Sequence, residues 1–437
     1  MRRNGVAGSY QRQVADLDGW RTMRRYLVAA AVIAMLGSVT ARPVLATQST
    51  RTHHHHHHYH HHRVAHHAVP LYHAVLLEDA DSGRILYQEN PDLEWPPASM
   101  AKMMLLLVTE DQIKAGRVRL TDPVVISARS ALTGGSRLGL REGQVYPLRE
   151  LMKAALIRSA NDAAVAIAQK IGGGSVEATV RMMNLRARSL GMKETEYHTV
   201  EGLPPTPGHD VDFTSARDLA TLARALIFHT NLLQWSGLQT ASFDGGVATL
   251  HNTNHLIGHF PGCDGLKTGF TFHAGFNLTA TARRGDMRLI AVVLGAPSNA
   301  QRFAQAARFL EWGFDNFTRI PVLKGGQTLP VQVRTASGAL ISPVVAHPVS
   351  VVVRKDDVHD IHFQYEIPAA VSGAVEAGMP LGQVMVMDRG DTLDDVAAIC
   401  PFSTITRPAP DDTVTLNQPA GDNPKPLTGS NQNQVDR

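Results

Sequence analysis

The spacing of apolar residues changes along the chain, and the changes mark out segments with different structure. Two short apolar runs, 74–77 and 84–87, flank the turn sequence Asp-Ser-Gly at 81–83, which predicts a β-hairpin. Between 148 and 228 the apolar residues return three or four positions apart, the spacing of one helix face. This segment therefore predicts a block of helices.

Strand-like patterns return after the helical block. The runs Asp264–Thr271, Phe276–Ala282 and Met287–Leu294 predict three strands, and Ala300–Trp312 predicts a closing helix. Strands, then helices, then strands again are typical of one sheet with a helical insertion, which is an α+β fold. We expect residues 71–317 to form this domain.

A different pattern follows this domain. Apolar and polar residues alternate from Ile361 to Ile367, which predicts a half-buried antiparallel strand, and 349–353 and 384–387 predict two more. We expect residues 318–407 to form a small all-β domain. The tail 408–437 is rich in Pro, Asn, Gln, Asp and Gly, and this composition predicts disorder.

The N-terminal residues have the composition of an export signal. Residues 1–25 contain six arginines and no lysine, and Tyr26–Ala41 is an uncharged stretch of 16 residues. A basic lead, an apolar core and a small-residue exit predict a signal peptide over 1–46, and export to the periplasm or cell envelope. The stretch is short for a membrane span, which needs about 20 residues, and an uncleaved anchor remains the alternative.

Composition excludes several classes of function. Of 437 residues 19% are charged, and the net charge of +3 comes without a dense basic run, so nucleic-acid binding is not implied.

Eleven histidines between 53 and 67 predict a solvated linker over 47–70 with incidental metal affinity. The two cysteines lack disulfide or zinc-ligand spacing, and we expect Cys263 to be a packed thiol. No cofactor and no specific metal site are predicted.

Candidate chemistry begins at the helix that follows the hairpin. Pro96 and Pro97 precede a run of good helix formers, and proline is tolerated only in a helix's first turn, so Ser99 falls in that turn. Lys102 lies three residues on and shares its face. The positive end of the helix dipole favours an alkoxide and a neutral lysine. Ser99 and Lys102 are therefore a candidate nucleophile and base.

Two more short motifs lie downstream. Ser159 and Asn161 form an S-x-N at the turn between two predicted helices, where residues two apart can act together. Lys267, Thr268 and Gly269 form a K-T-G on a predicted strand, where the first and third residues face the same side. Alone, each motif is also explained by an ordinary helix cap or an exposed lysine. The Gly-rich stretch between the first two motifs lacks a phosphate-loop ending, and we expect it to form a wall of a cleft.

The three motifs together, in the order S-x-x-K, S-x-N and K-T-G, change this interpretation. With their surroundings, Pro97–Met104, Arg158–Ala164 and Asp264–Thr271, they give a chain that resembles the serine D-alanyl-D-alanine carboxypeptidases, the low-molecular-mass penicillin-binding proteins. The resemblance extends from about Tyr72 to Phe317, and the all-β segment looks like the family's C-terminal domain. It implies the fold of penicillin-binding proteins and β-lactamases, an antiparallel sheet flanked by helices with a helical subdomain.

The resemblance implies a catalytic role for each motif residue. Ser99 would be the acylated nucleophile and Lys102 its base, with a pKa lowered by the helix end and by Lys267 nearby. Ser159 would relay a proton to the leaving D-alanine. Asn161 would hold Lys102 and the substrate amide.

The resemblance implies a substrate-binding strand as well. Lys267 and Thr268 would bind the terminal carboxylate of the substrate beside Gly269, and Arg302 is a further candidate for that carboxylate. The backbone N–H groups of the nucleophile and of Phe270 would form the oxyanion hole. The implied substrate is a peptidoglycan pentapeptide stem, and β-lactam antibiotics would acylate the serine.

Several alternatives stay open. A class A β-lactamase needs a glutamate in an E-x-x-L-N loop, and Glu177–Arg181 does not match it. An endopeptidase of the same family would cut D-alanyl cross-links, and an inactive wall-binding scaffold would keep the fold, although the intact motifs argue against that. Many members attach to the membrane through a C-terminal amphipathic helix, which the tail lacks, so peripheral membrane association is only a possibility.

Overall fold

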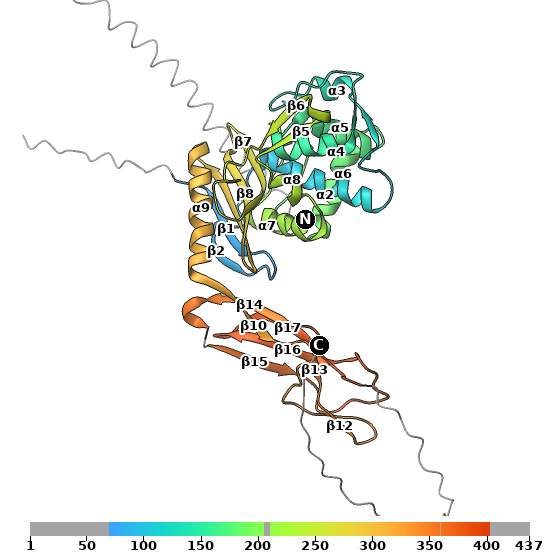
Figure 1. Cartoon of the computed structure of the whole chain (residues 1–437), viewed down its shortest axis with the longest axis vertical. Helices are drawn as coiled ribbons and strands as arrows, with labels where there is room; N and C mark the ends of the chain where they lie inside the picture. Colours follow the sequence, from blue (N-terminus) through green and yellow to red (C-terminus); the bar gives the residue numbers. More distant parts are fainter. Residues whose placement is uncertain (1–69, 205–209, 359, 403–437) are drawn as a thin grey trace, which may run out of the picture. The chain divides into compact units, whose positions relative to one another are not determined.

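The computed structural model describes residues 70–204, 210–358 and 360–402, and its largest element is one five-stranded sheet (Figure 1). The strands are antiparallel, in the order β2-β1-β9-β8-β7. They are β1 (Ala74–Asp79), β2 (Ile85–Glu89), β7 (Cys263–Thr271), β8 (Gly275–Arg284) and β9 (Met287–Ala296). The N-terminal hairpin thus joins the three later strands through the β1–β9 pairing, which confirms the predicted sheet with a helical insertion.

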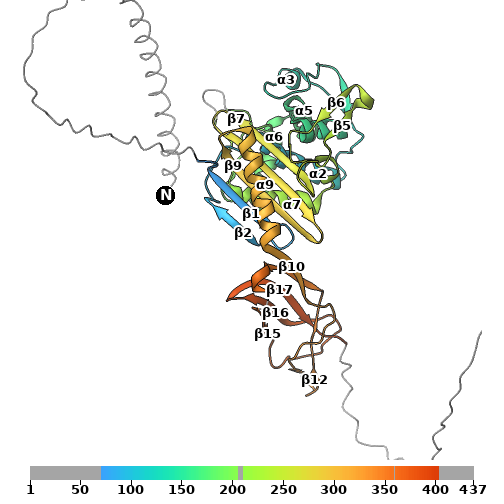
Figure 2. The same ribbon diagram turned by 60° about the vertical axis from the view of Figure 1, so that its left-hand side comes forward.

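Both faces of this sheet are buried. Helix α9 (Asn299–Asn316) covers one face, and α2 (Ala101–Lys114) and α7 (Ala216–His229) lie on the other (Figure 2). Strand β9 shows how alternation serves the two cores. Its residues facing α2 and α7 are Ile290, Val292 and Leu294, and those facing α9 are Leu289, Ala291 and Val293. Burial on both sides explains the nearly continuous apolar sequence of this strand.

The helical block lies between β2 and β7 in the sequence. Its residues 148–158 form α4 (Leu148–Lys153) followed by a π-helical turn (Ala154–Arg158), rather than one continuous α-helix. Local departures of this kind are frequent at functional sites and leave no trace in apolar spacing. The remaining elements are α3 (Ala128–Ala131), α5 (Asn161–Ile171), α6 (Val176–Ser189), α8 (Leu233–Ser236), β3 (Pro123–Val125), β4 (Val145–Pro147), β5 (Thr240–Phe243) and β6 (Ala248–His251).

Asn161 and Asp162 are residue types that often cap helices, but they do not cap helix α5. The cap position is Ala160, whose backbone is extended, and the helix starts at Asn161. Both polar side chains are used elsewhere, as the site shows below. Residue types that often cap helices therefore make other contacts here.

A second, all-β part follows α9. A four-stranded antiparallel sheet has the order β13-β17-β16-β15, and β10 pairs with β14. In β15 exposed and half-buried residues alternate as predicted. Its strands are β10 (Phe317–Leu323), β11 (Val333–Arg334), β12 (Leu340–Ile341), β13 (Val344–Val345), β14 (Val349–Arg354), β15 (Ile361–Glu366), β16 (Pro380–Asp388) and β17 (Asp391–Ile399).

The predicted signal peptide, most of the His-rich linker and the predicted disordered tail lie outside the described residues. Within the described ranges, no helix has the length and apolar character needed to cross a bilayer. The proposed domain boundaries therefore remain predictions.

A buried ion pair joins β1 to β10. The Asp79 carboxylate is fully buried and accepts bonds of 2.9 and 2.8 Å from Arg319 Nη2. The same nitrogen also bonds Asp81 at 2.9 Å, and Asp79 accepts from the Ser82 hydroxyl. A buried carboxylate depends on such partners, because losing them leaves an uncompensated charge.

Arg319→Ala should therefore lower the free energy of unfolding by about 3–5 kcal/mol, the usual cost of breaking a buried pair from one side. Chemical denaturation measures this change. The control is Arg129→Ala, whose pair with Glu177 is exposed and should contribute about 1 kcal/mol or less. Equal changes in the two variants would contradict the importance of the buried pair.

Candidate active site

Ser99 and Lys102 stand at the start of α2. A 3₁₀ turn (Ala98–Met100) carries Ser99, and Lys102 lies in the first turn of the following helix. The Lys102 side chain is fully buried, and its Nζ lies 3.0 Å from Ser99 Oγ. Ser99 itself is partly exposed. The hydroxyl is therefore accessible from outside while the amine that can accept its proton is shielded from water.

The electrostatics of Lys102 suit a general base. Burial lowers the pKa of this lysine to about 7, against the opposing charges of Glu201, Asp212 and Asp162. A base whose pKa lies near the working pH is present in its neutral form and still accepts protons. Burial is the first cause of this shift, whereas the sequence interpretation named the helix end and Lys267.

Strand β7 brings the K-T-G motif against the serine turn. A side chain at Gly269 would place its Cβ only 2.5 Å from the Pro97 carbonyl oxygen, so glycine is what allows this approach. Lys267 is buried, and its Nζ donates to the Thr268 carbonyl at 2.9 Å. Burial lowers the pKa of Lys267 well below its ordinary value, and the charges of Lys102 and Arg302 lower it further.

Arg302 supports this strand from α9. The side chain is 7% exposed, and its guanidinium donates to the carbonyl oxygens of Gly269 at 3.0 Å and Asn277 at 3.3 Å. Burial lowers the pKa of Arg302 to about 10. The Nε atom is buried without a partner among the described residues. Phe270, which follows Gly269 on this strand, is 44% exposed.

The S-x-N motif follows the π-helical turn. Ser159 is 5% exposed and has a left-handed backbone, with φ of 63°. Such a conformation costs a non-glycine residue energy and is frequent at functional sites. Asn161 Nδ2 donates to the Gly134 carbonyl at 2.8 Å, and no hydrogen bond joins Asn161 to Lys102 in the described structure. The buried Asn161 Oδ1 has no hydrogen-bond partner in the described structure. Buried polar atoms normally have one, so this oxygen is an unsatisfied acceptor.

Asp162 attaches the Gly-rich stretch to this motif. Its buried carboxylate accepts from the backbone N–H groups of Leu138, Gly139 and Leu140, at 3.1, 2.9 and 3.0 Å. The backbone N–H of Asn161 donates to the Ser136 carbonyl at 2.7 Å. One carboxylate and one asparagine thus fix the loop beside Ser159.

Comparison with known proteins agrees with this geometry. A family model described as D-alanyl-D-alanine carboxypeptidase matches residues 61–298, more than half of the chain. The chain belongs to the D-alanyl-D-alanine carboxypeptidase family. This membership confirms the resemblance that the three motifs indicated, and it makes the protein a serine hydrolase of the penicillin-binding type.

Relatives cover most of the described fold. D-alanyl-D-alanine carboxypeptidase DacF from Bacillus subtilis is 34% identical over 325 residues, 73% of this chain and 82% of that protein. Penicillin binding protein 5 from Haemophilus influenzae superposes with a TM-score of 0.68 and 27% identity, over 77% of this chain and 99% of its own. Penicillin-Binding Protein D2 from Listeria monocytogenes, solved in an ampicillin-bound form, gives 0.51 and 29% over 56% and 97%. The expected fold class is therefore confirmed.

Sequence reasoning missed the residue that holds Lys102 from the other side. Lys102 Nζ donates to the Glu201 carbonyl oxygen at 2.7 Å. The next residue, Gly202, has φ of 79°, and a Cβ there would lie 1.8 Å from the Ala98 carbonyl oxygen. A Glu-Gly pair in a loop carries no spacing signal, so only its position in the fold reveals this role.

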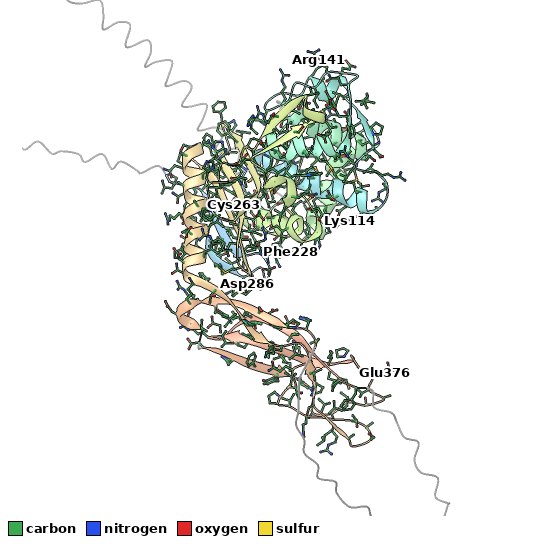
Figure 3. All side chains as sticks on the ribbon, viewed as in Figure 1. Lys114, Arg141, Phe228, Cys263, Asp286 and Glu376 are labelled. Carbon is green, nitrogen blue, oxygen red and sulfur yellow. The ribbon has the colours of Figure 1, made fainter. Side chains whose placement is uncertain are left out.

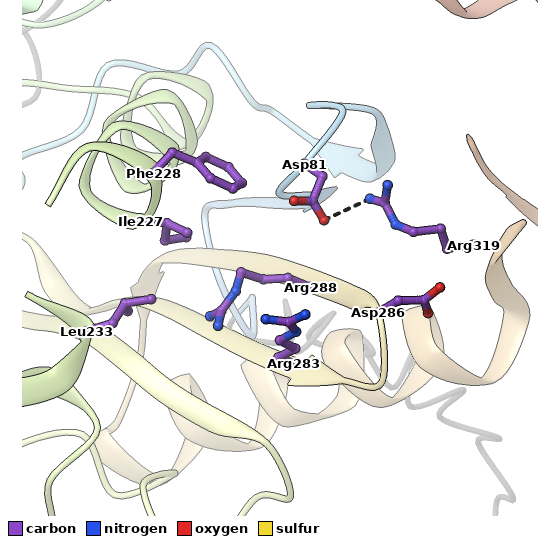
Figure 4. A pocket seen from close by; sticks show the side chains of 8 residues that line it. All are labelled: Asp81, Ile227, Phe228, Leu233, Arg283, Asp286, Arg288 and Arg319. Carbon is purple, nitrogen blue, oxygen red and sulfur yellow. Dashed lines mark hydrogen bonds and ion pairs between the residues drawn. The ribbon is translucent and has the colours of Figure 1, made fainter. Parts of the chain in front are cut away.

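Cys263 and the described cavity carry no part of the site. Burial raises the pKa of the Cys263 thiol to about 11, which agrees with a packed, protonated thiol at the start of β7 (Figure 3). A cavity of about 430 Å³ is lined by Arg288, Arg319 and six other residues (Figure 4). Arg288 already pairs with Asp264, and Arg319 with Asp79 and Asp81. Within the described residues, no cluster of three potential metal ligands occurs.

Asp162→Asn should slow acylation at least 10-fold, because one acceptor oxygen becomes an NH₂ group facing backbone donors, and bonds to a charged group are worth about 1.5–3 kcal/mol each. Stopped-flow acylation by a fluorescent penicillin measures the rate. Asp218→Asn is the matched control, since that buried carboxylate also accepts from a backbone N–H and a hydroxyl, Glu194 and Thr195. If both variants lose stability and acylate equally fast, the loop attachment is not needed for the site.

Proposed function

We propose that this chain removes the terminal D-alanine from peptidoglycan stem peptides through an acyl-enzyme on Ser99. The supporting observation is the 3.0 Å hydrogen bond between Lys102 Nζ and Ser99 Oγ, in a chain that belongs to the carboxypeptidase family. Because burial lowers the pKa of Lys102 to about 7, a large fraction of the amine is neutral near neutral pH. A neutral amine can accept the serine proton.

In the acylation step, Ser99 Oγ attacks the carbonyl carbon of the penultimate D-alanine and Lys102 takes the hydroxyl proton. The bond to the terminal D-alanine nitrogen then breaks, and the proton that Lys102 took from Ser99 is relayed through the Ser159 hydroxyl to this leaving amine, which leaves Lys102 neutral again. Backbone N–H groups of Ser99 and Phe270 would stabilise the oxyanion. Water next attacks the ester, and its proton returns through Lys102 as Ser99 is restored.

Lys267 and Thr268 would bind the terminal carboxylate of the substrate. Burial disfavours the charged form of Lys267, so the free site has a weakly solvated amine on the strand that packs against the serine turn. An incoming carboxylate favours the ammonium form, and Arg302 below the strand adds positive charge. Asn161 Oδ1, which is buried and unpaired in the described structure, would accept an N–H group of the substrate.

Export and inhibition complete the proposal. The N-terminal pattern over 1–46 supports export to the periplasm or envelope, where the peptidoglycan substrate lies. β-Lactams would acylate Ser99, in line with the ampicillin-bound form of the Listeria relative. An endopeptidase acting on cross-links is the second candidate function, because the same motifs serve both reactions.

Ser99→Ala should abolish labelling by a fluorescent penicillin and D-alanine release, while the thermal melting curve stays close to wild type. Loss of a covalent nucleophile costs on the order of 10⁴–10⁶ in kcat. One gel and one release assay check both activities. Covalent labelling of the alanine variant would sink the assignment, and a wild type that neither labels nor releases D-alanine would favour an inactive scaffold.

Lys267→Ala should lower kcat/KM at least 10-fold on a peptide that ends in D-Ala-D-Ala, because a bond to a charged group is worth about 1.5–3 kcal/mol. Amidation of the terminal carboxylate should slow the wild type about as much and the variant much less. Such non-additivity is the sign of two partners in one interaction. Equal cleavage of free and amidated peptides by the wild type would favour the endopeptidase function.

A further inference from the structure

Lys102 has a second neighbour besides Ser99, and this neighbour carries a carboxylate. The carbonyl oxygen of Glu201 accepts from Lys102 Nζ at 2.7 Å, which places residue 201 directly beside the base. The Glu201 side chain is half-buried and turns back onto its own loop, where Oε2 accepts from the Val200 N–H at 3.2 Å. The residue whose carbonyl oxygen contacts the buried amine therefore also carries a half-buried carboxylate.

The loop that carries Glu201 is fixed independently of Lys102. The Asp212 carboxylate accepts from the N–H groups of His198 and Thr199, at 2.6 and 2.9 Å, and from the Thr199 hydroxyl. The Thr199 hydroxyl in turn accepts from the Gly202 N–H at 2.8 Å. Gly202 packs on the Ala98 carbonyl, so the loop contacts the serine turn itself. The position of Glu201 is thus set by the fold and not by a chance rotamer.

Other charges act on Lys102 as well. Asp162 on α5 and Asp212 favour its charged form, but both carboxylates have three or more hydrogen bonds from the loops that they hold. Lys267 on β7 and Arg302 on α9 are basic groups of the same site, and burial disfavours the charged form of Lys267. Among the charged groups that act on Lys102, Glu201 has the largest effect. Within the described residues, its carboxylate accepts hydrogen bonds only from backbone N–H groups, those of residues 200 and 201.

Burial acts on the two groups in opposite senses. It lowers the pKa of Lys102 and raises that of Glu201, and each group's charge counters the effect on the other. Such a pair titrates as a unit, so the protonation of the amine depends on the carboxylate.

Building on the proposed acylation of Ser99, we propose that Glu201 is a positioning residue whose side-chain charge sets the pH at which Lys102 becomes able to take the serine proton. The Glu201 carbonyl holds the amine in place, and the carboxylate of the same residue adjusts how readily the amine loses its proton. An anionic neighbour favours the ammonium form, so removing the charge should make Lys102 a base at lower pH.

The test is the pH profile of acylation in Glu201→Gln, which keeps the size of the side chain and the main-chain carbonyl. The second-order rate of acylation by a fluorescent penicillin is measured from pH 5.5 to 9 with the full chain. The acidic limb should move down by about half a pH unit or more, which makes the variant about threefold faster than wild type on that limb. A limb that stays or moves up would overturn the proposal.

Two further variants separate charge from packing. Glu201→Asp keeps the charge, so its limb should lie at the wild-type pH even if its plateau rate falls, and a limb displaced as in the glutamine variant would contradict a role for the charge. Glu78→Gln is the matched control, since Glu78 is a buried glutamate whose pKa is likewise raised, to about 8, but it lies on β1 near the charges of Arg224 and Arg217. Its limb should not move, and an equal shift there would overturn the proposal by showing a nonspecific effect.

Failure of this inference and failure of the proposed function give different results. If Ser99→Ala still labels with penicillin, the nucleophile is wrong. If Ser99→Ala is unlabelled and the Glu201→Gln profile matches wild type, the function stands and only the role of Glu201 is lost. If Glu201→Gln does not fold, Glu201→Ala takes its place, because it also removes the charge and keeps the main-chain carbonyl, and its limb should move down in the same way; a limb at the wild-type pH would overturn the proposal.

Discussion

The burial of one ammonium group is the constraint on which the rest of the site depends. Lys102 is fully buried in the first turn of α2, and water does not solvate it. Its Nζ has two oxygen partners, the Ser99 hydroxyl and the Glu201 carbonyl, which is fewer than the three donors of the charged form. The site therefore favours a neutral amine with a free lone pair, and that lone pair is what the serine proton needs.

Three segments far apart in the sequence must approach closely to create this environment. Gly269 on β7 packs on Pro97, and Gly202 packs on Ala98, each at a distance that no side chain would allow. Ala98 and Ser159 both have left-handed backbones, with φ of 50° and 63°. Backbone strain at Ser159 and at the residue before Ser99 indicates that the sheet and the helical block over-determine the geometry of the site.

The periodic parts of the fold were predictable from sequence, and the close approaches were not. The strands of the central sheet and the helices around it follow from the spacing of apolar residues. The site followed from the order of the three motifs and from the elements that carry them. The π-helical turn before Ser159, the attachment of Asn161 to Gly134 and the contact of Glu201 with Lys102 carry no periodic signal. They result from packing between distant segments, as does the burial that lowers the pKa of Lys102.

Carboxylates make this packing possible in a site that contains two buried lysines. Asp162 and Asp212 each fix a loop through several backbone N–H groups, and each adds negative charge near Lys102. Hydrogen bonds from the loops largely satisfy these two carboxylates. Their charges therefore counter only part of the effect of burial on the pKa of Lys102, and they do not hold the amine fully in its charged form. The same groups thus shape the walls around Ser99 and limit how positive its surroundings become. Geometry and protonation in this site are therefore set by the same few residues.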